Sequence, residues 1–326
     1  MYKVRPVYDD IRLFFDEPSH KYTDNLGNEY ISTTTLLHNY KPKFDKEYWL
    51  NKKAKELHIS KERLAKQWQE ITDEACKRGT KTHNGLEDSI KDTSMFYKAV
   101  QHIKRNDNSM TTVADIETID QYVKPIILDD FIQKTENKYP KVYEIFDYYI
   151  TNGYKIYSEI GGFIPDLLIS GTIDILILRE DKFIIGDWKT NRGGLKFESG
   201  YYKKDKRQNP HQTTDVWVST NNKLLPPVAH LADCNGAIYN LQLSMYAFMV
   251  EYILGLPCAG LWLCHIDSDF VLNEYGMPKR FPDGLYHLKE IVTVHKMKYL
   301  RTEIINILED RRKNIAASRI ASKTLF

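Results

Sequence analysis

Residues 171–190 read GTIDILILREDKFIIGDWKT, and this stretch decides the fold. Two apolar runs, Leu167–Leu178 and Phe183–Trp188, cover most of it and are separated by the charged residues 179–182. Short runs that are rich in β-branched residues and joined by a polar turn are typical of neighbouring β-strands. The stretch therefore predicts an antiparallel strand-turn-strand unit.

Two carboxylates and a lysine lie in this unit. Asp174 ends the motif G-T-I-D, and Asp187 begins the motif D-W-K-T, so antiparallel pairing would bring their carboxylates together. Because strand side chains alternate, Lys189 shares a face with Asp187, while Trp188 points into the opposite layer. Paired carboxylates bind a hard cation, and a lysine beside them can stabilise charge on a phosphate. The pattern predicts a centre for phosphodiester hydrolysis, although D-x-K alone is also common at exposed strand ends.

Polar residues one helical turn apart form two further clusters. The segment 78–87 reads RGTKTHNGLE and places His83 and Glu87 on one helix face, where His83 could complete a metal site. Gln242 and Tyr246 have the same spacing, and an amide and a phenol can hydrogen-bond a phosphate or the lysine. Each cluster alone is also compatible with an ordinary amphipathic helix. Glu159 is a further polar candidate, with a solvated strand-end carboxylate as the alternative.

In this order, the motifs R-G-T-x-x-H-x-x-x-E, E, G-T-I-D, D-W-K-T and Q-L-x-x-Y resemble the RecB-like branch of the PD-(D/E)XK nucleases. The resemblance extends from about Arg78 to Tyr246. The earlier Ser32-Thr33-Thr34 is similar to the S-x-T element of mitochondrial genome maintenance exonuclease and related phage enzymes. The P-D of the family name is I-D in this chain, a departure that keeps the carboxylate.

The resemblance implies an α/β fold like that of restriction endonucleases, with a central mixed β-sheet flanked by helices and a helical insertion. It implies Mg²⁺ or Mn²⁺ held by His83, Asp174, Asp187 and the carbonyl of Trp188, with Lys189 catalytic. It assigns supporting roles in catalysis to Gln242, Tyr246, Glu87 and Glu159.

We expect one nuclease domain over residues 1–326. Its expected parts are an N-terminal β-hairpin with the S-x-T element (1–45), a helical region that carries His83 (46–157), a catalytic sheet core (158–290) with an inserted basic loop (191–233), and a C-terminal helix (291–326).

The inserted loop mixes cations with aromatic residues, a composition suited to phosphate contact and base stacking. We interpret it as a flexible clamp, with a plain solvated loop as the alternative. The residues expected to contact DNA are Lys203, Lys204, Lys206 and Arg207 in this loop, and Arg78, Thr80, Ser32, Thr34 and Thr190 elsewhere.

The bulk composition sets limits on these expectations. A net charge of +2 over 326 residues gives no global nucleic-acid signature, so a DNA-binding surface must come from local charge. No apolar run of membrane-spanning length and no signal-peptide pattern occurs, so we expect a cytoplasmic protein without a membrane partner, in the host cytoplasm if it is viral. The four cysteines contain no C-x-x-C pair, so we expect no iron-sulfur cluster. A Walker A loop is also absent.

The sequence thus predicts a metal-dependent deoxyribonuclease. We expect an exonuclease on single-stranded DNA or DNA ends, acting in recombination, repair or phage genome processing, with recombination or replication proteins as possible partners. The alternatives are a structure-specific or nicking endonuclease with the same centre and a non-catalytic DNA-binding recombination partner.

Overall fold

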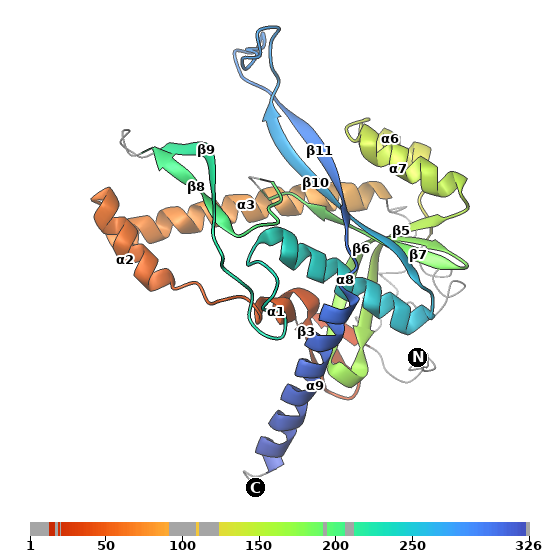
Figure 1. Cartoon of the computed structure of the whole chain (residues 1–326). Coiled ribbons are helices and arrows are strands. Elements are labelled where there is room, and N and C mark those ends of the chain that lie inside the picture. Colours follow the sequence, from red (N-terminus) through yellow and green to blue (C-terminus); the bar gives the residue numbers. More distant parts are fainter. Residues whose placement is uncertain are drawn as a thin grey trace.

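The computed structural model describes residues 13–16, 19, 21–90, 109–110, 124–191, 194–205 and 212–323 (Figure 1). The helices are α1 (Thr33–His38), α2 (Lys46–Leu57), α3 (Lys61–Ile90), α6 (Leu128–Lys134), α7 (Pro140–Thr151), η1 (Pro165–Leu167), α8 (Asn235–Leu254) and α9 (Arg301–Lys323). The strands are β1 (Leu13–Asp16), β2 (Lys21–Asp24), β3 (Glu29–Ser32), β4 (Ser109–Met110), β5 (Lys155–Ile164), β6 (Ile169–Arg179), β7 (Lys182–Lys189), β8 (Gly200–Asp205), β9 (Gln212–Ser219), β10 (Cys258–Phe270) and β11 (Leu288–Met297).

A mixed sheet forms the centre of the described part, in the order β11-β10-β7-β6-β3-β2-β1-β4, with β5 on β6. β10 runs parallel to β7, and β3 runs parallel to β6, while the other pairs are antiparallel. Helices flank this sheet (Figure 1). The predicted general class, an α/β fold with a central mixed sheet between helices, is therefore confirmed.

The predicted strand-turn-strand unit is present as β6 and β7. The antiparallel register pairs Ile175 with Gly186 and Leu178 with Phe183. At its start, β6 pairs instead with β3, but only at Ile169 and Ser170. The stretch 171–174 therefore lies at a fork, where β3 has turned into α1 and β7 has not yet joined the ladder.

Two apolar layers cover the two faces of the sheet. One contains the buried residues of α1, α8 and α9 against the sheet, including Leu241, Leu263 and Ile304. The other contains residues of α3, α6 and α7 against Trp188 and Trp262. Trp188 thus lies in the layer opposite to α8, as its position in the strand predicts.

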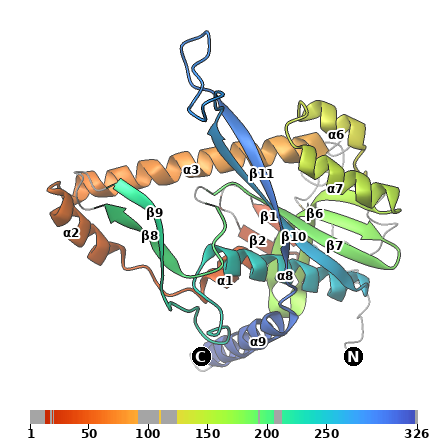
Figure 2. The same ribbon diagram turned by 45° about the horizontal axis from the view of Figure 1, so that its top comes forward.

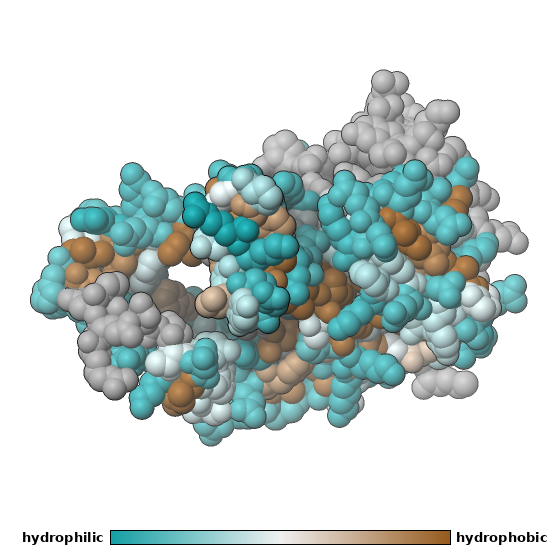
Figure 3. Space-filling model, turned by 90° about the horizontal axis from the view of Figure 1, so that it is seen from above, coloured by the Kyte–Doolittle hydropathy of each residue, from teal (hydrophilic) through white to brown (hydrophobic). Residues whose placement is uncertain are grey.

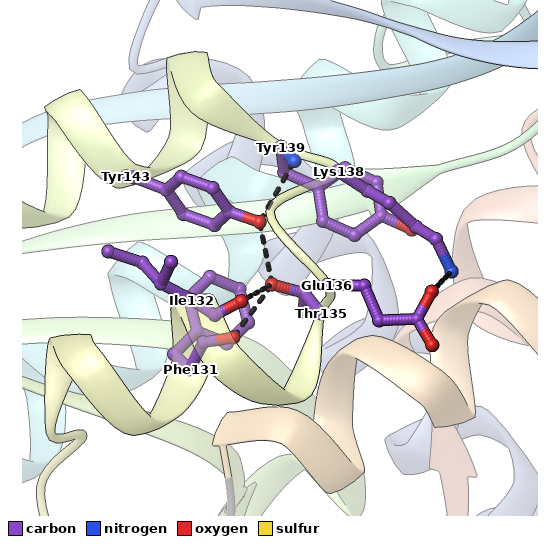
Figure 4. A network of polar contacts seen from close by, with 7 residues as sticks. All are labelled: Phe131, Ile132, Thr135, Glu136, Lys138, Tyr139 and Tyr143. Atoms are coloured by element: carbon purple, nitrogen blue, oxygen red, sulfur yellow. Dashed lines mark hydrogen bonds and ion pairs between the residues drawn. The ribbon is translucent and has the colours of Figure 1, made fainter.

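The junction of α6 and α7 is held by a compact polar network (Figure 4). The hydroxyl of Thr135 donates to the carbonyl of Phe131 over 2.7 Å and lies 2.6 Å from the hydroxyl of Tyr143. That hydroxyl accepts the backbone N–H of Tyr139 over 2.9 Å. Because these buried groups satisfy one another, the two helices form a fixed cover over the Trp188 side of the sheet.

A separate arm projects from the sheet, consisting of α2, the first half of α3 and the β8–β9 hairpin (Figure 2). Leu50, Ala54 and Leu64 form a small apolar cluster that joins α2 to α3. The hairpin lies near the end of α2, since Lys204 contributes to the lowered pKa of Glu56, after Lys53 and Lys52. Seen from above, the space-filling view shows an opening through the molecule in this region (Figure 3).

Several predicted elements differ from the structure. Residues 291–297 belong to strand β11, and the C-terminal helix begins at Arg301, because the β-branched run 291–294 favours a strand over the helical period. The helical region ends at Thr151, and Lys155 already begins β5. The inserted basic loop contains the β8–β9 hairpin.

In the described part of the chain, no helix is both long enough and apolar enough to cross a membrane.

Candidate active site

Asp174 and Asp187 come together at the fork in the sheet. Continuing the register from Ile175 and Gly186 places the two aspartates opposite each other. The backbone N–H of Trp188 donates to Oδ2 of Asp174 over 3.1 Å, so a carboxylate replaces the ladder bond that is lost where the strands separate. Both are buried, with 7% of Asp174 and 1% of Asp187 exposed. The predicted convergence of these carboxylates is present.

Burial of Asp187 is the main electrostatic feature of the site. Burial raises its pKa to about 7, Lys189 acts to lower it, and the neighbouring Asp174 raises it further. One oxygen, Oδ2, forms an ion pair with Nζ of Lys189. The other oxygen, Oδ1, is buried and accepts no hydrogen bond from a donor among the described residues, and the carboxyl of Asp187 lies within hydrogen-bond reach of Asp174. A buried carboxylate oxygen without a partner is costly, unless a cation or a ligand group binds it.

Lys189 remains a cation in this environment. Burial alone would lower its pKa, but Asp187 and Asp174 outweigh that effect and raise it. Its Nζ also lies 5.0 Å from the centre of the Tyr239 ring, within cation–π range. Because its pKa is raised, Lys189 stays protonated at neutral pH and cannot act as a base. It can act only as a fixed positive charge.

Helix α8 supplies the polar residues on this side of the site. Nε2 of Gln242 donates to the hydroxyl of Tyr246 over 3.2 Å, and both side chains are buried. Burial raises the pKa of Tyr246 well above its usual value, and the charges of Asp187 and Asp174 add to this effect. The predicted pair on one helix face therefore lies within reach of the acidic pair.

Gly171 allows Tyr246 to approach the sheet. A Cβ at this position would lie 2.7 Å from Cε1 of Tyr246 and 3.0 Å from Oγ1 of Thr33. The hydroxyl of Thr33 donates to the carbonyl of Ser170 over 3.1 Å and fixes α1 at the fork. The glycine of G-T-I-D is thus a packing requirement of the site.

Glu159 occupies a strained position in the same row of the sheet. The register pairs Ser158 with Ile175 and Ile160 with Ile173, so Glu159 lies opposite Asp174. Its φ of 57° is in the left-handed region, which is uncommon for a residue other than glycine. Three acidic positions therefore lie side by side on β5, β6 and β7. Non-glycine residues with this backbone strain are enriched at functional sites.

Helix α3 meets the end of β7 next to the lysine motif. A Cβ at Gly79 would lie 3.1 Å from Oγ1 of Thr190, so the helix backbone approaches this residue closely. Leu86 is buried in the layer that contains Trp188. Position 83 lies on α3 between these two contacts. The side chains of His83 and Glu87, like that of Arg78, lie outside the described residues, so their metal-binding and catalytic roles stay predictions.

The donor set suits a divalent cation such as Mg²⁺ or Mn²⁺. Asp174 and Asp187 offer hard carboxylate oxygens on adjacent strands, and the unpartnered Oδ1 of Asp187 is the atom that such an ion would satisfy. Among the side chains that the structure describes, no three histidine, cysteine, aspartate or glutamate residues form a ready metal-binding group. Asp174 and Asp187 thus supply two carboxylates, and Glu159, although opposite Asp174 in the sheet, does not complete a group of three with them.

The structure places the expected DNA-contacting residues around the arm and α1. Lys203 and Lys204 are exposed on β8, and Thr80 is exposed on α3. Ser32 caps α1, since its hydroxyl accepts the backbone N–H of Thr35 over 3.1 Å, and it lies 3.1 Å from the hydroxyl of Thr34. Lys206 and Arg207 lie outside the described residues.

Two residues near the lysine were not found from the sequence. Tyr239 lies three residues before Gln242 and seven before Tyr246, and this spacing on one helix face was the available signal. His265 is buried on β10 in register with Lys189, and its Nε2 lies 2.7 Å from the carbonyl of Asn191. Its place beside β7 depends on strand pairing, which no local pattern reveals.

Comparison with known proteins gives no relative, since no family model and no curated protein matches this chain.

Proposed function

We propose that this protein is a metal-dependent DNA nuclease of the PD-(D/E)XK type, and that it is an exonuclease that acts on single strands or free DNA ends. The observation that carries the proposal is the buried pair Asp174 and Asp187 at a fork in the sheet, with Lys189 ion-paired to it. A purely structural role would not call for two adjacent buried carboxylates with an unpartnered oxygen.

Each residue has a defined task in this proposal. Asp174 and Asp187 would hold a divalent cation, with Mg²⁺ or Mn²⁺ as the best chemical match. The cation would supply Lewis-acid polarisation of the scissile phosphate. Lys189 would stabilise negative charge as it develops on the phosphate, and the ring of Tyr239 and the carboxylate of Asp187 keep its ammonium in place.

The neighbouring residues on α8 would orient these groups. Gln242 holds the hydroxyl of Tyr246, and that hydroxyl can donate to a phosphate oxygen or to a carboxylate of the pair. Burial of the site strengthens each electrostatic contact with the phosphate and with the water molecule that hydrolysis consumes.

Action on free ends is supported by the arm. Gly79 of α3 contacts Thr190 next to the site, the hairpin end carrying Lys204 lies near Glu56 of α2, and the backbone N–H of Lys196 donates to Oδ1 of Asn235 over 2.8 Å. These neighbours bring α3, α2, the hairpin and α8 together on the side of the molecule where Figure 3 shows an opening. A single strand with an end could enter such an opening, whereas a closed circle could not.

The test is cleavage of end-labelled linear single-stranded DNA by the wild type and by Asp187→Ala, in Mg²⁺, Mn²⁺ or EDTA. We expect cation-dependent products with the wild type alone, and an intact circular single-stranded control. Cutting of the circle would replace the exonuclease by an endonuclease with the same centre. Binding without cleavage in every metal would refute the enzymatic proposal.

A further inference from the structure

The strands β10 and β11 extend far beyond the sheet from which they start. β10 accompanies β7 only as far as His265, which pairs with Lys189. It then continues to Phe270, five residues or about 16 Å further, paired with β11 alone. We name residues 266–292 the finger and residues 271–288 its tip. The finger starts at the strand position next to the catalytic lysine.

The tip of the finger has a fixed backbone. Its first turn is closed by Asn273, whose side-chain oxygen accepts the backbone N–H groups of Tyr275 and Met277 over 2.9 and 3.0 Å. Its second turn is closed by Phe281, whose backbone N–H donates to the carbonyl of Leu285 over 2.9 Å. The backbone N–H of Val271 donates to the carbonyl of His287 over 2.9 Å and joins the two sides.

The side chains that this backbone presents are aromatic and apolar. Tyr275 is 77% exposed and Tyr286 is 55% exposed, and Phe270 lies edge-on to Tyr286 with ring centres 6.1 Å apart. Met277 and Leu285 are exposed as well. A rigid backbone that holds several apolar side chains in solvent is a feature of binding surfaces.

The charge of the tip favours contact with bases over contact with phosphates. Residues 271–288 contain two basic and two acidic side chains, so their charges cancel. Both basic groups have partners inside the tip, since Lys279 lies 5.1 Å from the centre of the Phe281 ring and Nε of Arg280 donates to the carbonyl of Gly284 over 3.0 Å. The whole finger, residues 266–292, has three basic and five acidic side chains, so its exposed rings rather than its charges would contact DNA, by stacking on nucleobases.

The finger also has a suitable place in the molecule. In Figures 1 and 2 it rises from the sheet between the arm and helices α6 and α7. A strand that passes along the arm to Lys189 therefore passes the base of the finger. A duplex is too wide to follow a single strand into a buried site, so its end would meet the projecting tip.

We propose that the finger is a strand-separating wedge, in which Tyr275 and Tyr286 stack on the terminal base pair of a duplex while one strand enters the active site. The proposal rests on the nuclease function proposed above and adds a second activity, the processing of duplex DNA next to a single-stranded arm. The ligand is the exposed face of a DNA base pair.

The test uses the double variant Tyr275→Ser/Tyr286→Ser, with Tyr148→Ser as the matched control, because Tyr148 is an exposed tyrosine on α7 and not part of the finger. The substrates are a labelled single strand and a duplex with a single-stranded arm on either strand. We expect the double variant to digest the single strand within about twofold of the wild-type rate. We expect its digestion into the duplex to fall about tenfold, which corresponds to about 1.4 kcal/mol.

Equal digestion of the duplex by the double variant and the wild type would overturn the wedge. A wild type that stops at the junction would overturn it as well. Cleavage of the single strand reports on the nuclease function separately. If no substrate is cut, 2-aminopurine in the terminal base pair provides the readout in EDTA: the wild type should change its fluorescence, and an equal change with the double variant would refute the wedge.

Discussion

A single buried carboxylate largely determines the chemistry of this site. Asp187 loses its solvation on folding, and one of its oxygens gains no hydrogen bond among the described residues in return. The ion pair with Lys189 offsets part of that cost, but burial still raises the pKa of Asp187 to about 7. Such a group costs stability and is kept where it has a function.

We predict that Asp187→Asn stabilises the metal-free protein at pH 8. The folded protein holds the proton of Asp187 more tightly than the unfolded chain, whose ordinary value is 3.8, so the free energy of unfolding falls as pH rises from about 4 to about 7. Asparagine removes this loss. The variant should exceed the wild type by about 1 kcal/mol or more at pH 8 and approach it at pH 5.

Thermal unfolding in EDTA across this pH range checks the prediction. Lys189→Met serves as the opposite control, because it leaves the buried acidic pair without its cation and should lower stability at pH 8. Parallel stability curves for the wild type and Asp187→Asn would show that Asp187 does not titrate in this range.

Tyr239 should matter through its ring. We predict that Tyr239→Phe keeps most of the cleavage activity, because the face that Lys189 approaches at 5.0 Å remains. Tyr239→Leu should lower kcat about tenfold with little change in KM, since the ammonium then loses one of its two fixed contacts. Equal activity of the two variants would show that the ring of Tyr239 does not contribute to catalysis.

At the scale of elements, the site depends on how three neighbours meet β6. β3 pairs with the start of β6, β7 with its end and β5 along its length. Asp174 therefore lies in the gap between the pairing of β6 with β3 and its pairing with β7. α8 and α3 then approach through glycines, at Gly171 and Gly79 respectively. The geometry of the site is therefore set by backbone approach as much as by its side chains.

We predict that Gly79→Leu lowers the cleavage rate about tenfold or more while the helix stays folded. Leucine is the better helix former by about 0.8 kcal/mol, but its side chain would push Thr190 and the adjoining lysine strand away from α3. Gly85→Leu is a matched control on the same helix, because a Cβ at that position meets no atom within 4 Å. Similar loss of activity in both variants would contradict a specific contact at Gly79.

The sequence predicts some of these elements much better than others. The apolar runs of β6 and β7, and the polar ends with Asp174, Asp187 and Lys189, are local patterns, so they can be recognised without a structure. The run from Ile291 fits both a helical and a strand period, and only its pairing with β10 resolves the choice. The fork, Tyr239 and His265 arise from contacts between distant segments, which one sequence does not display.

At the scale of the whole molecule, the proposed function gives the arm a role in the selection of substrates. The exposed Lys203 and Lys204 lie on strand β8 of the hairpin, which belongs to the arm. The base of the finger lies next to Lys189, since His265 pairs with it. In the proposed function, the arm and the finger would both contact a DNA substrate before cleavage and would select which substrates are cut.

We predict that Lys203→Glu/Lys204→Glu weakens the binding of single-stranded DNA and reduces its dependence on salt. Loss of two phosphate contacts should lower the slope of log affinity against log salt by about 1.4. Lys141→Glu, an exposed position on α7, is the control and should leave the slope unchanged. An unchanged slope for the double variant would show that the hairpin does not contact the DNA backbone.

Calorimetric titration of the metal-free protein with Mn²⁺ can show whether Asp174 and Asp187 form a divalent-cation site. The wild type should bind Mn²⁺ more tightly at pH 8 than at pH 6, as Asp187 loses its proton, and Asp187→Asn should lose most of this affinity. Equal binding by the wild type and Asp187→Asn, or no binding by the wild type, would contradict the account.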